Sequence, residues 1–199
     1  MELFDKLQDN EAVMEEFHTS INHGIYVSNM AYLLAKEVGL QEARCYELAV
    51  AGMLHDIGKV RASKLLYVEQ ADHNFVVKQI NYLRRHPFLG FDLLKNQGYS
   101  DFILESILFH HENYDGSGYP SNLSGELIPI GARILRICDV FVALVTKKAY
   151  RPAHDVDSAL EFMISDVKNF DMKIFLTFMN LVSEIDVDRD IKKKTVTDK

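Results

Sequence analysis

Five of the eight histidines in this 199-residue chain fall where expected helices end or meet a loop. At such positions, side chains from different helices can converge on one point. Neutral imidazole is the commonest nitrogen ligand of transition metals, and carboxylates complete the sites of harder, water-activating ions. Two aspartates suit that second role, namely Asp56 beside a histidine and Asp139 within an apolar helix. The five histidines are His23, His55, His86, His110 and His111.

Asp139 has two interpretations. Arg136 stands three residues earlier, and an ion pair between them on a partly exposed helix face would explain the aspartate without a metal. The surrounding run 134–141 is otherwise almost entirely apolar, which leaves little exposed face. A carboxylate buried there is costly unless it is paired or coordinated, and a metal ion is a sufficient partner.

The histidines have structural interpretations as well. His86 precedes Pro87 and could simply cap the next helix. His110 and His111 are adjacent, so on a helix their side chains point about 100° apart. They can converge on one ion only where the helix ends. The glycine-containing break at residues 113–118 supplies that end.

The elements that must position these residues are helices. Apolar residues recur at i, i+3 and i+4 along most of the chain, and only 10 Gly and 4 Pro interrupt them. This pattern predicts an all-α fold, a single compact bundle of roughly seven to nine helices. Residues 59–73 and 113–129 are expected to be irregular. We expect helices over residues 20–38, 42–55, 75–85, 87–95, 101–111, 129–147, 156–167 and, capped by Asp171, 171–185.

The composition excludes several classes of protein. With 48% hydrophobic and 26% charged residues the chain is not disordered, and no uncharged apolar run approaches a membrane span. The net charge of −7 argues against sequence-independent binding to duplex nucleic acid. The N-terminus lacks a secretory signal pattern, and Cys45 and Cys138 are far apart, so we expect a protein of the reducing cytoplasm.

Two motifs carry a resemblance to a known family. The pair His55–Asp56, followed by Ile, Gly and Lys59, resembles the signature of the HD superfamily of metal-dependent phosphohydrolases. The run from His110 to Pro120 resembles the signature of the HD-GYP subfamily. Residues around His23, the His86–Pro87 pair and segment 125–144 also match the family, so the resemblance covers about residues 20–185.

The resemblance implies an all-helical domain whose dinuclear metal centre hydrolyses a phosphodiester, typically cyclic di-GMP. One divalent metal would be held by His23, His55, Asp56 and Asp139, and the other by His86, His110 and His111, with Asp56 bridging the two. Such mixed ligands favour Fe or Mn, although they also bind Zn. The implied catalytic residues are Asp56 and Lys59, and the implied substrate-binding residues are Lys148 and Arg151.

Charge arithmetic is consistent with an anionic substrate. Two divalent ions and two aspartates leave a local charge of about +2, so a phosphodiester can bind inside a protein of net charge −7. Lys59 would add a cation near the phosphate, unless it is simply a solvated loop lysine.

The sequence departs from the family at three places. Thr19 stands where one subgroup carries a glutamate that supports a third metal, so we predict two metals. Val142 replaces a second aspartate, and Lys148–Ala149 replaces an Arg–Pro pair. These changes leave open a second hypothesis, a metal-containing but weakly active or inactive signalling module that binds a nucleotide or a cyclase partner. A helical scaffold without metals and an enzyme for another phosphate ester are further alternatives.

We divide the chain into an N-terminal helical extension (1–19), the HD-GYP-like domain (20–185) and a charged, frayed tail (186–199). In the family, the glycine loop at 116–120 is implicated in contacts with diguanylate cyclase domains. The first 17 residues resemble no sensory domain. The expected partners are therefore a cyclic dinucleotide substrate and either a diguanylate cyclase domain or a separate sensory protein.

Overall fold

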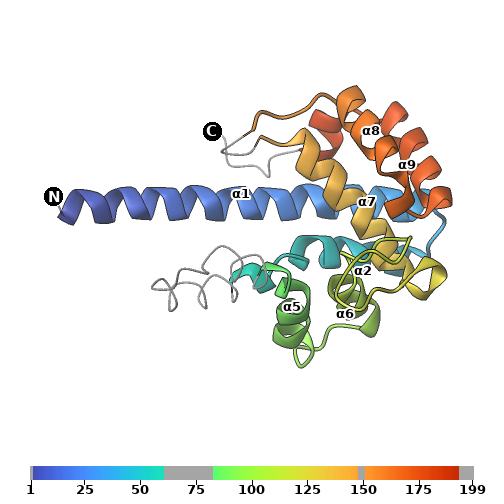
Figure 1. The fold of residues 1–199 in the computed structure, drawn as a ribbon, viewed down its shortest axis with the longest axis horizontal. Helices are drawn as coiled ribbons and strands as arrows, with labels where there is room; N and C mark the ends of the chain where they lie inside the picture. The colour runs from blue at the N-terminus through green and yellow to red at the C-terminus, as the bar shows by residue number, and fades with distance from the viewer. Residues whose placement is uncertain (1, 61–82, 148–150, 193–199) are drawn as a thin grey trace.

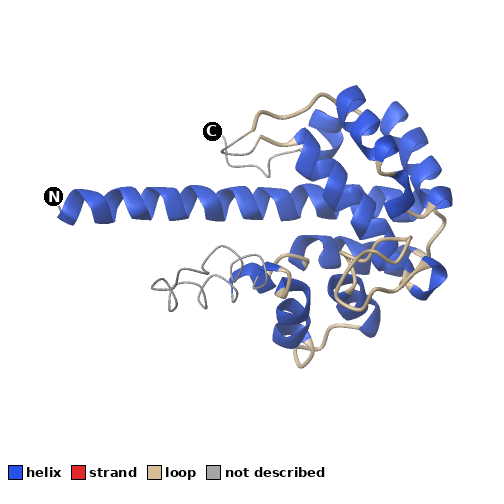
Figure 2. Cartoon of the chain, in the orientation of Figure 1, coloured by secondary structure: helices blue, strands red, loops and turns tan. Residues whose placement is uncertain are grey.

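The computed structural model describes residues 2–60, 83–147 and 151–192, with side chains from residue 18 onward. The predicted all-α class is confirmed, because every regular element in these ranges is a helix (Figure 2). None of these helices is long and apolar enough to cross a membrane. The helix expected over 75–85 and the loop expected over 59–73 lie mostly outside the described residues.

The first helix, α1 (Glu2–Glu37), is much longer than the predicted 20–38. No Gly or Pro occurs between residues 2 and 19, so nothing in the sequence ends the helix there. Figure 1 shows the first half of α1 extending away from the helices that pack around its second half. In that second half Val27, Met30, Ala31 and Leu34 are fully buried at helical spacing. Gly39, with φ of 88°, ends the helix as predicted.

Helix α2 (Glu42–Leu54) returns along α1 and contacts it closely. Helices α5 (His86–Leu94) and α6 (Asp101–Leu108) follow, and α6 packs against α2. The hydroxyl of Ser100 accepts a hydrogen bond from the backbone N–H of Ile103 at the start of α6. The prediction that α6 continues to residue 111 is wrong. The helix ends at Leu108, and His110 and His111 lie in the turn that follows.

The central helix is α7 (Ile130–Val145), which begins after Pro129 and contacts α1, α6, α8 and α9. Helices α8 (Val156–Ser165) and α9 (Met172–Glu184) close the bundle. Asp171 caps α9, as predicted, and its side chain also binds Arg133 of α7 at 2.6 Å. The buried rings of Phe141, Phe175 and Phe178 pack where α7 meets α9.

The segment after α9 differs from the expected frayed tail. Val187–Ile191 forms a short π-helix, in which Val187 is buried and Ile191 is fully buried. The side chain of Asn29 on α1 donates a hydrogen bond to the carbonyl of Ile191 at 2.9 Å. Val187 and Ile191 lie four positions apart, so this charged segment has one apolar face that can be buried. Residues 193–199 lie outside the described residues.

Candidate metal centre

The end of α2 carries the first metal-ligand motif. His55 and Asp56 follow Leu54 directly and lie in a tight turn that continues to Gly58. A Cβ atom at Gly58 would lie 2.0 Å from the carbonyl oxygen of His86, so only glycine fits. This close approach holds the turn against the start of α5 and brings Asp56 next to His86.

One group of ligand atoms joins α1, α2 and α7. Asp139 Oδ1 lies 2.9 Å from His23 Nε2 and 3.7 Å from His55 Nε2. Arg136, the alternative partner, donates from Nε to Asn113 Oδ1 at 3.0 Å. Asp139 therefore faces the histidines, and the ion-pair interpretation does not account for it. His23, His55 and Asp139 place their ligand atoms within 4.8 Å of one another, close enough for one metal ion.

A second group joins α5 to the turn after α6. His86 Nε2 and His110 Nε2 lie 3.2 Å apart. The ring centroid of His111 lies 4.9 Å from that of His86 and 4.1 Å from that of His110. The end of α6 at Leu108 is what allows the two adjacent histidines to face the same point. These three imidazoles could hold a second ion.

Asp56 lies between the two groups. Its Oδ1 is 3.2 Å from His86 Nε2, and its Oδ2 is 3.4 Å from His55 Nε2. Lys59 Nζ donates to Oδ2 at 2.6 Å. One carboxylate thus presents one oxygen to each histidine group, which is the arrangement that a bridging ligand requires.

The imidazoles of His55, His86 and His110 share one hydrogen-bond pattern. Each Nδ1 atom lies close to the backbone carbonyl oxygen three residues earlier, at 2.7 Å for His55 and at 2.6 Å for both His86 and His110. A carbonyl oxygen only accepts, so Nδ1 carries the proton and donates. The Nε2 atom of each ring is therefore the one available to a metal ion.

The surroundings of Asp56 and Asp139 lower the pKa of both carboxyl groups. Burial acts to raise the pKa of Asp56, but the neighbouring His55, His86 and Lys59 hold it well below its usual range. Burial also acts against the ionised form of Asp139, yet its contacts with His23 and His55 keep its pKa well below the usual range. Both carboxylates are therefore ionised at neutral pH.

The histidines divide into two classes in the metal-free protein. Burial would lower the pKa of His55, but Asp56 and Asp139 outweigh it and raise that pKa to about 10. Burial lowers the pKa of His110 to well below its usual range, and lowers that of His111 to about 3 although Asp139 acts in the opposite direction. His110 and His111 are thus neutral, the form that binds metals.

Unpartnered buried atoms test whether these residues suit a metal. His23 Nδ1, His55 Nε2 and Asp56 Oδ1 are buried without a hydrogen-bond partner. A buried polar atom without a partner is costly, and a cation held between the two groups would satisfy His55 Nε2 and Asp56 Oδ1 together. The donor set of imidazoles and carboxylates fits divalent transition metals.

Comparison with known proteins agrees with this geometry. A model of the HD domain family matches residues 5–174. The chain belongs to the HD-domain family.

Two curated relatives of this HD domain are phosphodiesterases. The cyclic di-GMP phosphodiesterase response regulator RpfG of Xanthomonas campestris is 36% identical over 140 residues, which are 69% of this chain and 36% of that protein. The 3′3′-cGAMP-specific phosphodiesterase 1 of Vibrio cholerae is 30% identical over 160 residues, 78% of this chain and 36% of that protein. The chain thus spans little more than a third of the length of either relative.

A solved structure shows the same fold. The HDG"Y"P protein Bd1817 of Bdellovibrio bacteriovorus superposes with a TM-score of 0.65 at 18% identity, over 82% of this chain and 52% of that one. At this identity the likeness establishes the fold alone.

Two residues, Glu112 before the glycine loop and Tyr119 within it, have contacts that the sequence did not predict. Glu112 is 2% exposed, and its Oε1 accepts a hydrogen bond from the backbone N–H of Ser121 at 2.6 Å. A Cβ at Gly118 would lie 2.2 Å from the backbone nitrogen of Asn113, so the loop folds back directly onto the histidine turn. Tyr119 then stacks on His111, with the ring centroids 4.8 Å apart. Hydrophobic periodicity carries no signal for such contacts within a loop.

The other predicted site residues lie at different distances from the centre. Lys59 is in direct contact with Asp56, although its side chain is 45% exposed. Arg151 donates to the carbonyls of Ala143 and Leu144 near the end of α7 and lines a cavity that also includes Asp139. Lys148 lies outside the described residues.

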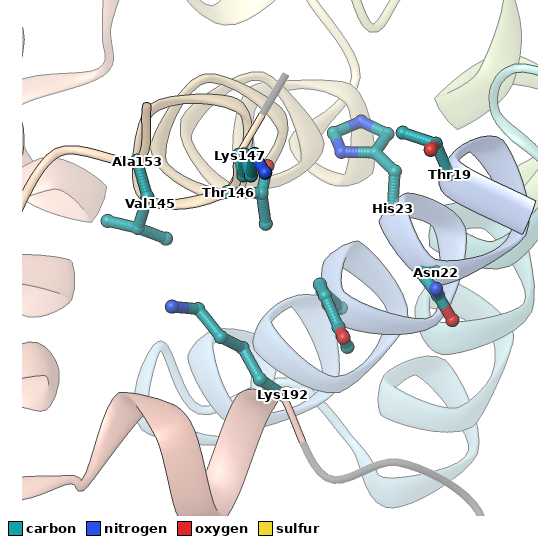
Figure 3. Close-up of a pocket in the computed structure, with 9 residues that line it drawn as sticks. Thr19, Asn22, His23, Val145, Thr146, Lys147, Ala153 and Lys192 are labelled. Carbon is teal, nitrogen blue, oxygen red and sulfur yellow. The ribbon is translucent and has the colours of Figure 1, made fainter. Parts of the chain in front are cut away.

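A separate cavity of about 330 Å³ opens beside His23 (Figure 3). Thr19 lies next to His23 on α1 and lines the same cavity. Lys192 extends into the cavity from the C-terminal segment, and Lys147 lines it from the end of α7. The lysines add positive charge to the approach to the metal centre.

Proposed function

We propose that this HD domain hydrolyses a phosphodiester bond of a cyclic dinucleotide, cyclic di-GMP, with two divalent metal ions, Fe or Mn. The observation that carries the proposal is the position of Asp56 between the two histidine groups, one oxygen toward each. Two curated relatives of the chain are phosphodiesterases for cyclic dinucleotides, which supports the same substrate class here.

The ligands are assigned as follows. His23, His55 and Asp139 would hold one ion, His86, His110 and His111 the other, and Asp56 would bind both. When bound, the ions would supply Lewis-acid polarisation of the phosphoryl oxygens and activation of a water molecule. Thr19 offers no carboxylate, which supports two ions rather than three.

The remaining chemistry belongs to the side chains around the ions. Lys59 is anchored on Asp56 while almost half of its side chain is exposed, so its ammonium can face both the centre and an incoming phosphate. We assign it to stabilise charge that develops on the phosphate or the leaving oxygen. Arg151 and Lys148 are proposed to contact the substrate, Arg151 from the cavity that it shares with Asp139.

We also propose a cytoplasmic location, where cyclic dinucleotide signalling takes place and where the free thiols of the buried Cys45 and Cys138 would persist. The proposed protein partner is a diguanylate cyclase domain or a separate sensory protein. Such a partner could act through the glycine loop, because Tyr119 of that loop touches His111.

The alternative, an inactive receptor, drew on Val142 in place of an aspartate and on Lys148–Ala149, which lies outside the described residues. Val142 is fully buried within the apolar core, so its side chain is packed away from solvent and from any substrate. A valine at this position therefore removes none of the candidate metal ligands. The enzyme is the better-supported function, and binding without turnover is the outcome that would favour the receptor.

The test combines metal analysis with a substrate panel on the protein as purified. We expect about two Fe or Mn ions per chain, hydrolysis of cyclic di-GMP, and loss of both metal and turnover in Asp56→Asn. Asp92→Asn is the matched control, because Asp92 forms the same i, i+3 ion pair with a lysine (Lys95, 2.7 Å) but on the outer part of α5. Cyclic di-GMP bound tightly without hydrolysis across Fe, Mn and Zn would overturn the enzymatic assignment.

A further inference from the structure

Two neighbouring cavities lie between α7 and α8. One, of about 330 Å³, includes Asp139 and Arg151 in its walls. The other, of about 220 Å³, includes Arg136 and Asp166. Val140, Leu144 and Phe162 line both cavities, which are therefore adjacent; the two together are called here the α7–α8 groove. The groove begins at a candidate metal ligand and leads away from it.

Phe162 gives this groove an aromatic wall. Its side chain is 53% exposed although α8 is otherwise anchored by the buried Ala159 and Met163. The ring of His154 meets it edge to face at 4.8 Å, which leaves the phenyl ring held in place but not covered. An exposed aromatic ring beside the apolar side chains of Val140 and Leu144 is a suitable platform for stacking a nucleobase.

The charged groups at the far end of the groove select among bases. Arg136 is fixed by the hydrogen bond from its Nε to Asn113, and its terminal amino groups provide its remaining N–H donors. Asp166 offers an acceptor-only carboxylate in the same cavity. Guanine presents acceptors at O6 and N7 and donors at N1 and N2, whereas adenine places an amino donor beside N7. A guanidinium can donate to O6 and N7 of guanine together, and a carboxylate can accept from its N1 and N2 together, whereas no edge of adenine has two adjacent acceptors or two adjacent donors. The presence of Arg136 and Asp166 in one cavity therefore suits guanine.

We propose that the α7–α8 groove holds one guanine of the substrate, stacked on Phe162, with Arg136 at its acceptor edge and Asp166 at its donor edge. The proposal rests on the proposed function, since it places the base beside the centre where the phosphodiester is cleaved. It assigns base recognition to Phe162, Asp166 and Arg136, none of which the sequence analysis named as a candidate site residue.

The experiment measures binding of 5′-GMP and 5′-AMP to the purified protein by titration calorimetry. Neither probe contains a phosphodiester bond, so binding is read without the proposed reaction. We expect 5′-GMP to bind more tightly than 5′-AMP, Phe162→Ala to weaken 5′-GMP at least about fivefold, and Asp166→Asn to reduce the preference for 5′-GMP. Ile164→Ala is the matched control, because Ile164 is 48% exposed on the same helix and does not line the groove.

Thermal unfolding of each variant keeps the comparison interpretable. Phe162 is exposed, so Phe162→Ala should unfold at nearly the temperature of the parent protein. If Phe162→Ala and Ile164→Ala bind 5′-GMP equally well, or if 5′-AMP binds as tightly as 5′-GMP, the guanine site is wrong even when cyclic di-GMP is hydrolysed. If cyclic di-GMP is not hydrolysed but these binding differences appear, the proposed activity fails and the guanine site stands.

Discussion

His86 Nε2 and His110 Nε2 face each other at 3.2 Å, although each ring already uses Nδ1 to donate to a backbone carbonyl. Neutral rings in that tautomer direct two lone pairs at one another. Such a contact is unfavourable unless a cation lies between the nitrogens or one ring takes up a second proton. Burial opposes the second option for His110, because it lowers the pKa of that imidazole.

Removal of metal should therefore destabilise the protein. At a metal concentration 100 times its Kd, binding stabilises the folded state by about 2.7 kcal/mol, which corresponds to roughly 5–11 °C in Tm for a chain of this size. The measurement is thermal unfolding before and after treatment with a chelator, followed by addition of Mn²⁺. Identical unfolding curves in all three conditions would contradict the assignment of a metal centre.

Metal binding should release protons in a defined pH range. In the metal-free protein the pKa of His55 is raised to about 10, so its imidazole is charged at pH 7.5 and must lose a proton to bind a metal. His110 and His111 are already neutral and release none. We expect His55 to release its proton when metal binds near pH 7.5, and this contribution to fall as the pH rises through about 10. Calorimetric titration with Mn²⁺ in buffers of different ionisation enthalpy measures this release, and an enthalpy independent of buffer would refute it.

Gly58→Ala should disrupt the centre although residue 58 is not a ligand. The added methyl would lie 2.0 Å from the carbonyl oxygen of His86, so the turn that carries Asp56 must move away from α5. Overpacking of this kind costs about 1–3 kcal/mol, and we expect metal content to fall with it. The readouts are Tm and bound metal per chain.

Gly90→Ala is the control for this substitution. A Cβ at Gly90 meets its nearest neighbours at 3.4 Å, which is an ordinary contact, and alanine suits the interior of α5. Its stability should equal or slightly exceed that of the parent protein. Equal effects of the two substitutions would show that the contact between Gly58 and His86 does not position the site.

Ile191→Ala should lower the free energy of unfolding by about 2–5 kcal/mol, because the side chain is fully buried in a segment that contacts α1. Urea unfolding measures the change. Leu176→Ala removes a similar side chain that is 55% exposed on α9, and it should change stability by no more than about 0.5 kcal/mol. A negligible effect of Ile191→Ala would mean that residues 187–191 do not belong to the folded core.

The identities of the candidate ligands and the helical class could be predicted from the sequence. Both depend on local information: the types of residue in short motifs and at a few family-matched positions, and apolar positions that repeat with the period of a helix. The ends of the helices could be predicted less well from the sequence. The break after Leu108 depends on how the following loop packs, because neither Gly nor Pro marks it, whereas the continuation of α1 through residues 2–19 is consistent with the absence of Gly and Pro there.

Relationships between distant atoms were decided only by the tertiary structure. No local pattern states that the two oxygens of Asp56 face different histidine groups, that Glu112 secures the glycine loop, or that Ile191 packs against α1. The α7–α8 groove exists because α8 folds back on α7 at a distance that leaves Phe162 uncovered. Each of these features is a distance between segments separated along the chain, and side-chain packing across the whole bundle sets such distances.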